Sequence, residues 1–169
     1  MKPTAAPRRR RGLAPVLAPD ASVLILGSFP SEASLAARQY YAHPRNHFWP
    51  ILGAILDERL ADLAYAERLT RVKAHRVAIW DTIVSCERAG SLDTAIRNAE
   101  QGEIKRVERV ARKLKAVCFN GNTAGRARAA WARAGYATLV LPSTSPAYTR
   151  PMNDKLAAWR QLARWLEEA

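Results

Sequence analysis

The stretch Ser22-Val23-Leu24-Ile25-Leu26-Gly27 decides the fold, because it is a continuous apolar run of strand length that ends at a glycine. Three later runs share this character and cover residues 77–80, 116–119 and 138–141. Apolar runs that do not alternate with polar residues are typical of strands buried on both faces, as in a parallel sheet covered by helices. The sequence therefore predicts a short, buried parallel sheet.

Segments with helical spacing lie between these runs. Residues 48–56 form one, and residues 104–114 place four apolar side chains on one face. Thr123 is a candidate cap for a further helix that carries Trp131, and residues 156–166 form a last apolar face. Strands that alternate with helices predict an α/β fold.

The size and charge of the chain limit what it can be. Its 169 residues suit one domain, predicted over residues 20–169, with a flexible basic arm over residues 1–19. The net charge of +12 favours a polyanionic partner such as a nucleic acid. The chain has no apolar run near the roughly 20 residues of a membrane span and no secretory signal. Together with the high Ala and Arg content, this leads us to expect a bacterial cytoplasmic protein.

Two cysteines, Cys86 and Cys118, are too few for a disulfide framework and have no neighbouring ligands for a metal. Buried free thiols are the simplest interpretation. We expect no cofactor and no metal.

Ligands of open parallel sheets bind beyond the carboxyl ends of the strands, which selects four loops. The first covers residues 27–34, where Ser28, Ser31 and helix-start amides can hold a phosphate. The alternative is an ordinary turn with Ser31 as a helix cap. A Walker-type phosphate loop is excluded, because no Gly-Lys-Ser/Thr is present.

The second loop covers residues 39–50 and interleaves aromatic side chains with His, Arg and Asn. This mixture suits a pocket that stacks on a flat ring and hydrogen-bonds its edge. The alternative is a partly buried structural loop. We expect Trp49 to be structural and to face the core. A structural role is less expected for Phe48 and Asn46.

The third and fourth loops are also polar. Asn120, after the third strand, offers a donor and an acceptor that match a uracil or hypoxanthine edge, although Asn120-Gly121 also fits turn chemistry. Residues 141–148 place three hydroxyls between two prolines. They suit a phosphate grip or a plain polar loop, and this segment alone does not separate the two.

Taken together, the four loops resemble the uracil-DNA glycosylase superfamily, most of all its hypoxanthine-DNA glycosylase branch. The matching segments are Gly27-Ser28-Phe29-Pro30-Ser31, Gln39-Tyr40-Tyr41, His43-Pro44-Arg45-Asn46 with Phe48-Trp49, Trp80-Asp81, Gly90-Ser91-Leu92-Asp93, Phe119-Asn120-Gly121 and Leu141-Pro142-Ser143-Thr144-Ser145-Pro146-Ala147. They run in order from residue 22 to about 150, and the second segment is the most specific.

This resemblance implies a three-layer α/β/α sandwich around a four-stranded, mainly parallel sheet. It also implies monofunctional hydrolysis of the N-glycosidic bond of a deaminated base, uracil or hypoxanthine, in DNA. By the same resemblance, Asn46 would carry catalysis, Phe48 would stack on the flipped base and Asn120 would read its edge. Other base contacts are expected from Phe29 and Tyr41, and DNA contacts from Ser28, Ser31, Ser143, Ser145, Tyr148 and Arg150.

Two positions depart from the pattern of the superfamily. Phe29 stands where many members have Asp or Asn, which shifts the water-positioning role to Asn46. Tyr148 stands where relatives tend to have Asn, and it would either fill the gap left by a flipped base or change which base is accepted.

A dissociative cleavage needs positioned water and fixed donors for the departing base rather than a strong base. The Asn46 carbonyl can orient water, and His43 or His47 can donate to the base, or else be structural. The loops contain no lysine, so a Schiff-base step has no support.

Two other functions fit the composition. One is a nucleic-acid-binding module without catalysis, and the other is a hydrolase of free nucleosides or nucleotides. The combination of Asn46, Phe48 and Asn120 favours a DNA glycosylase. We expect it to be a monomer.

Overall fold

The structure is a computed structural model that describes residues 8–167. Its centre is a four-stranded sheet with the order β3-β2-β6-β7 in which every neighbouring pair is parallel. The strands are β2 (Val23–Gly27), β3 (Val77–Asp81), β6 (Ala116–Asn120) and β7 (Ala137–Leu141). The predicted parallel sheet is confirmed.

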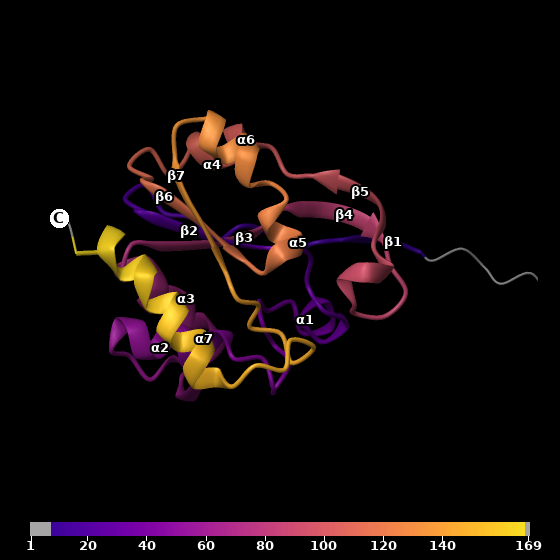
Figure 1. Cartoon of the computed structure of the whole chain (residues 1–169), viewed down its shortest axis with the longest axis horizontal. Helices are drawn as coiled ribbons and strands as arrows, with labels where there is room; N and C mark the ends of the chain where they lie inside the picture. The colour runs from indigo at the N-terminus through magenta and orange to yellow at the C-terminus, as the bar shows by residue number, and fades with distance from the viewer. Residues whose placement is uncertain (1–7, 168–169) are drawn as a thin grey trace, which may run out of the picture.

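Helices cover both faces of this sheet, which gives three layers (Figure 1). One face carries α2 (Phe48–Leu56), α3 (Tyr65–Ala74) and α7 (Met152–Trp159), and the other carries α4 (Ile104–Glu108), α5 (Asn122–Gly125) and α6 (Arg128–Arg133). The short α1 (Glu32–Ala37) follows β2, and three 3-10 turns complete the set: η1 (Leu60–Asp62), η2 (Asp93–Ala95) and η3 (Arg160–Trp165). The α/β/α sandwich is therefore confirmed.

The continuous apolar character of β2 is explained by its two buried faces. Val23 and Ile25 pack into the cluster that contains Trp159, whereas Leu24 and Leu26 pack into the cluster that contains Trp131. Successive side chains of a strand point to opposite faces, so a strand covered on both sides has no position left for a polar residue.

A second, antiparallel sheet was not predicted. It has the order β1-β4-β5 and consists of β1 (Arg9–Arg11), β4 (Ile83–Glu87) and β5 (Arg97–Gln101). The prediction of a flexible arm is wrong for residues 8–19, because this segment contains β1. The backbone of β1 pairs with β4, and Val16 is buried and bridges to Ile79. The rest of the predicted arm, residues 1–7, lies outside the described residues.

Two details of the helices also differ from expectation. The segment predicted as one helix over residues 104–114 is helical only through Glu108. The helix predicted to be capped by Thr123 begins two residues earlier, at Asn122, with Gly121 at the N-cap position and a positive φ of 95°. Both cysteines are free and buried, as expected. Within residues 8–167, no helix is both long and apolar enough to cross a membrane.

Trp159 links the α7 layer to the loop after β7. Its ring is fully buried and lies edge-on to Phe48, and its indole N–H donates to the Pro142 carbonyl at 2.8 Å. We expect Trp159→Ala to lower the free energy of unfolding by about 3–5 kcal/mol, because it removes a large core side chain. Trp159→Phe keeps an aromatic ring and leaves only the Pro142 carbonyl unpaired, so its loss should be about 1–3 kcal/mol. Urea denaturation measures both, and equal stability of the two variants would contradict this assignment.

Candidate active site

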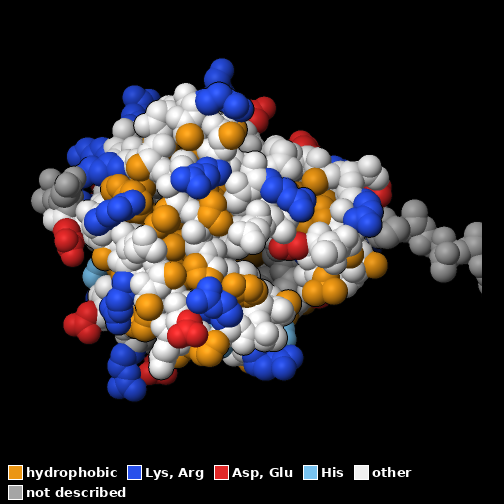
Figure 2. Space-filling view, in the orientation of Figure 1, with side chains coloured by type: hydrophobic (Ala, Val, Ile, Leu, Met, Phe, Trp, Pro, Cys, Tyr) orange, Lys and Arg blue, Asp and Glu red, His pale blue; other side chains and the backbone are white. Residues whose placement is uncertain are grey.

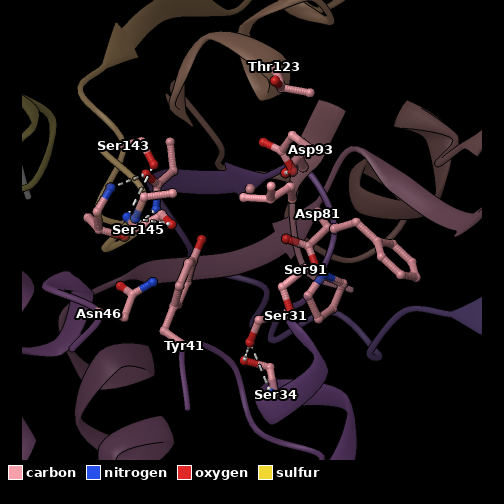
Figure 3. Close-up of a pocket in the computed structure, with 18 of the residues that line it drawn as sticks. Ser31, Ser34, Tyr41, Asn46, Asp81, Ser91, Asp93, Thr123, Ser143 and Ser145 are labelled. Carbon is pink, nitrogen blue, oxygen red and sulfur yellow. Dashed lines mark hydrogen bonds between the residues drawn. The ribbon is translucent and has the colours of Figure 1, made fainter. Parts of the chain in front are cut away.

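A cavity of about 430 Å³ opens at the carboxyl edge of the parallel sheet, and all four predicted loops line it (Figure 3). The predicted residues that line it are Ser28, Phe29, Ser31, Tyr41, Asn46, Asn120, Ser143, Ser145 and Tyr148. Those outside its lining are His43, His47, Phe48 and Arg150. The lining also includes Asp81, Asp93 and Thr144, to which the sequence assigned no role.

Asn46 lies in the loop that leads into α2. Its Oδ1 accepts a hydrogen bond from the backbone N–H of Phe48 at 2.9 Å, and this bond fixes the orientation of the amide. Its Nδ2 lies on the side of Tyr41, toward the cavity (Figure 3). Asn46 therefore offers a ligand an N–H donor, whereas we had expected its carbonyl to orient water.

The chain around Asn46 is anchored to the fourth loop. The next residue, His47, donates its backbone N–H to the Thr144 carbonyl at 3.0 Å, and the Asn46 N–H donates to the His43 carbonyl at 3.0 Å. These two bonds hold the loop across the end of the sheet. Asn46 is thus positioned by backbone contacts on both sides.

Phe48 does not reach the cavity. It has 0% exposed surface, and Tyr41 lies over it with ring centroids 3.9 Å apart and an angle of 18° between the planes. The structure therefore does not bring Phe48, expected to stack on a base, to the cavity, because the Tyr41 ring covers it. Trp49 is buried in the core, as expected.

Tyr41 takes its place through an unusual backbone. Its φ is 53°, in the left-handed region that non-glycine residues rarely adopt, and the resulting turn directs the ring toward the sheet edge. Burial and the Asp81 carboxyl raise the pKa of Tyr41 far above its ordinary value, and the nearby Asn120 amide offsets a part of that rise. The buried hydroxyl is neutral and makes no well-formed hydrogen bond within residues 8–167.

The two histidines are not placed to act as acids. The His43 Nδ1 accepts from the Arg45 N–H at 3.1 Å, so this ring is part of the turn. Burial, with the charge of Lys155 in addition, lowers the pKa of His47, which favours its neutral form. The expected proton donation by His43 or His47 has no geometric support, and the structural alternative fits both.

Asn120 and Thr144 form a reciprocal pair. The Asn120 Nδ2 donates to the Thr144 hydroxyl, and the Thr144 N–H donates to the Asn120 Oδ1, both at 2.9 Å. Asn120 therefore fixes the fourth loop, and only its second N–H is left to read a base. In that loop the hydroxyls of Ser143 and Ser145 accept backbone N–H groups two residues ahead, which leaves their own O–H groups to donate.

The first loop is held by the segment before β5. The Ser28 hydroxyl donates to Asp93 at 2.7 Å, and the buried Arg88 donates to the Pro30 carbonyl at 2.6 Å with its guanidinium over the Phe29 ring. Ser31 accepts from the Ser34 N–H and caps α1, so the capping alternative is confirmed for this residue. These contacts leave the loop little freedom to move.

Comparison with known proteins shows which family the chain belongs to. The sequence model described as the Uracil DNA glycosylase superfamily matches residues 14–167. The chain belongs to that superfamily. It is 36% identical over 155 residues to a protein of Methanosarcina acetivorans named hypoxanthine DNA glycosylase, covering 92% of this chain and 98% of the relative. A protein of Methanosarcina barkeri with the same name is 34% identical over 153 residues, covering 90% and 97%.

A solved structure agrees with this membership. The solution NMR structure of a candidate uracil DNA glycosylase from Methanosarcina acetivorans superimposes with a TM-score of 0.86 at 36% identity. The match covers 95% of this chain and 100% of that one. As a member of the uracil DNA glycosylase superfamily, the chain is a DNA glycosylase, a hydrolase of N-glycosidic bonds.

This member of the superfamily also carries a buried acid in its cavity. Asp81 ends β3, is only 4% exposed, and its Oδ2 has no hydrogen-bond partner within residues 8–167. Burial, reinforced by the carboxylate of Asp93, raises its pKa to about 7 although Arg88 opposes the rise. The sequence could have indicated this residue, because it ends its strand at the same sheet edge as Asn120.

A buried acid of this kind lowers stability as the pH rises. The unfolded chain releases the Asp81 proton above an ordinary pKa of 3.8, whereas the folded chain keeps it to about pH 7. The free energy of unfolding must therefore fall between these values. We expect Asp81→Asn to be more stable than the parent chain at pH 8, by up to about 4 kcal/mol, and this gain should vanish near pH 4. Urea denaturation at both pH values measures it.

The exposed variant Asp20→Asn is a matched control for this measurement. It removes the same formal charge outside the cavity, so it should keep the pH dependence of the parent chain. A gain at pH 8 shared by both variants would show that net charge, rather than burial of Asp81, controls stability.

Proposed function

We propose that this DNA glycosylase excises hypoxanthine from DNA, with uracil as a second accepted base, and leaves an abasic site. The observation that carries the proposal is the cavity at the sheet edge, where the Asn46 amide and the Tyr41 side chain converge from one loop. A flat base that is flipped out of the DNA duplex needs a pocket with hydrogen-bond donors along the edge of the base. The two relatives named hypoxanthine DNA glycosylase support the choice of base.

Hydrolysis without a covalent enzyme intermediate is supported by the lining of the cavity. A Schiff-base lyase needs an amine in contact with the sugar. No lysine is among the residues that line the cavity in the described part of the chain. Lys155 is buried, with its Nζ 3.3 Å from the Ser145 carbonyl and over the Tyr148 ring. Lys155 therefore stabilises the fourth loop and does not line the cavity. Because no lysine lines the cavity in the described part of the chain, we propose a monofunctional enzyme.

The proposed mechanism relies on neutral donors. As the glycosidic bond breaks, positive charge develops on the sugar and negative charge on the base. The Asn46 amide can stabilise the base in this state, because its orientation is fixed before the substrate binds. Among residues 8–167, no group of three or more His, Cys, Asp or Glu is arranged to hold a metal ion.

The surface supports a DNA substrate. Lys and Arg side chains outnumber acidic ones on the face seen in Figure 2, in several separate groups with hydrophobic side chains between them. Ser143, Ser145 and Tyr148 line the cavity and Arg150 is exposed just beyond them, which supports the proposal that they contact the phosphate backbone of DNA. We propose that the chain acts as a monomer, in the compartment that holds the chromosome, which for a bacterial protein is the cytoplasm.

The direct test is a cleavage panel of single- and double-stranded DNA that contains hypoxanthine, uracil or neither. We expect hypoxanthine release followed by alkali-sensitive abasic sites, and no strand cleavage before alkali, since hydrolysis stops at the abasic site. Strand cleavage without alkali would contradict the monofunctional assignment. Tight binding with no base release would favour a non-catalytic DNA-binding module, and release from the free nucleoside would favour a nucleoside hydrolase.

Substitution of Asn46 tests the proposed donor. Asn46→Ala should slow base release by about 10²–10³-fold while DNA binding persists, because a fixed donor to developing charge is lost. Asn46→Asp keeps an acceptor for the Phe48 N–H and removes only the donor, so it should be as slow as Asn46→Ala. Single-turnover kinetics measure the effect, with the exposed Asn153→Ala as control. If Asn46→Asp retained activity, the carbonyl rather than the N–H would be the active group.

A further inference from the structure

Two side chains that line the cavity, Asp81 and Tyr41, approach Gly27, and each carries a buried polar atom. These atoms, the Asp81 Oδ2 and the Tyr41 hydroxyl, make no well-formed hydrogen bond within residues 8–167. Buried polar atoms are almost always paired, and leaving one unpaired costs about 1–3 kcal/mol. Two such atoms in the lining of one cavity indicate a site that is completed by a ligand.

We propose that Asp81, in its protonated form, donates a hydrogen bond to a carbonyl oxygen of the flipped base and stabilises the negative charge that the base acquires as it leaves. This inference rests on the proposed function and adds the group that recognises the base. It gives a role to a residue that the Asn46 mechanism does not use.

The backbone of the sheet places Asp81 for this contact. Gly27 and Asp81 are paired at the ends of β2 and β3. A Cβ on Gly27 would lie 2.5 Å from the Asp81 Oδ1 and 2.9 Å from the Tyr41 hydroxyl. The space that glycine leaves empty is therefore where the carboxyl and the phenol approach the sheet edge. Asn46 lies on the other side of the Tyr41 ring (Figure 3), so donors can reach a base from two directions.

The charges around Asp81 favour the protonated form. Asp93, from the segment before β5, is held by the Ser28 hydroxyl and repels a second carboxylate. Arg88 opposes this effect, but its Nε and Nη2 donate to the carbonyls of Gly90 and Pro30, and its Nη1 makes no hydrogen bond within residues 8–167. Burial keeps Tyr40 and Tyr41 as neutral phenols, and the Asp81 charge contributes to the raised pKa of each.

A bound base strengthens this preference. Its ring displaces water from the cavity, and desolvation always disfavours the ionised carboxylate. A carboxylic acid kept neutral by an apolar site is an effective hydrogen-bond donor to a developing oxyanion.

The reaction balances without consuming Asp81. The bond between the base nitrogen and the sugar C1′ breaks, and its electron pair moves into the base, partly onto the carbonyl oxygen. The oxygen of water bonds to C1′, and the proton that water loses ends on the base. The Asp81 proton remains shared in the hydrogen bond and is retained when the free base leaves.

The test compares Asp81→Ala, which removes the donor, with Asp81→Asn, which replaces it by a neutral amide of similar shape. On duplex DNA containing hypoxanthine, Asp81→Ala should slow base release by about 10²–10³-fold, and Asp81→Asn should stay within about tenfold of the parent. The parent kcat/KM should fall above about pH 7, where free Asp81 loses its proton, by about tenfold per pH unit. Asp81→Asn should show no such fall.

Asp93→Asn gives a second, independent readout. It removes a charge that raises the pKa of Asp81, so the fall in kcat/KM should begin at lower pH than in the parent. The exposed Asp20→Asn, beside the amino end of β2, should keep the profile of the parent. Thermal melts of each variant separate loss of folding from loss of activity.

The outcomes separate this inference from the proposed function. If the parent chain releases no base, the proposed function fails before Asp81 is tested. If the parent is active but its rate rises with pH and Asp81→Asn is as slow as Asp81→Ala, then Asp81 acts as an ionised base and the inference is overturned. Full activity of Asp81→Ala would also overturn it and leave the proposed function standing.

Discussion

Where β2 ends, Gly27 leaves the space that a Cβ would fill, and three separate segments of the chain meet there. The Asp81 carboxyl arrives from β3, the Tyr41 hydroxyl arrives from the loop before α2, and both would lie less than 3 Å from any side chain on Gly27. Parallel strands in register make this meeting possible, because Gly27 and Asp81 end their strands at the same level. The cavity depends on that close approach more than on any single hydrogen bond.

The remaining contacts of the site mostly hold loops in place. The Asn46 carbonyl caps a backbone N–H, Asn120 is paired with Thr144, and the His47 backbone donates to the same Thr144. Each bond uses a donor or an acceptor that would otherwise face the ligand. What remains toward the cavity is a small set of groups whose positions are fixed before a base enters, which is the arrangement that electrostatic stabilisation of a transition state requires.

The sequence predicted the sheet and the loops better than the individual side chains. The four central strands are recognisable because burial on both faces excludes polar residues, and the position of the cavity follows from the carboxyl-edge rule. The strand Arg9–Arg11 has no such signal, because it is three arginines long, and it is held to β4 by backbone pairing and by the Arg9 side chain, which donates to Ser85. Tyr41, and not Phe48, lines the cavity because of the positive φ of Tyr41, which no spacing of residues reveals.

The protonation state of Asp81 affects both the stability of the folded chain and the chemistry of the cavity. The proposed substrates, deoxyinosine and deoxyuridine in DNA, have neutral bases in the ground state, and negative charge appears on the base only as the glycosidic bond breaks. A fixed cation would also attract the phosphates of undamaged DNA, whereas neutral donors such as Tyr41, the Asn46 amide and protonated Asp81 interact most strongly once that charge has developed. A buried acid destabilises the folded chain at neutral pH, where an amide would not. In the proposed role, the same burial that costs stability keeps the Asp81 proton in place and makes it a stronger donor to the departing base.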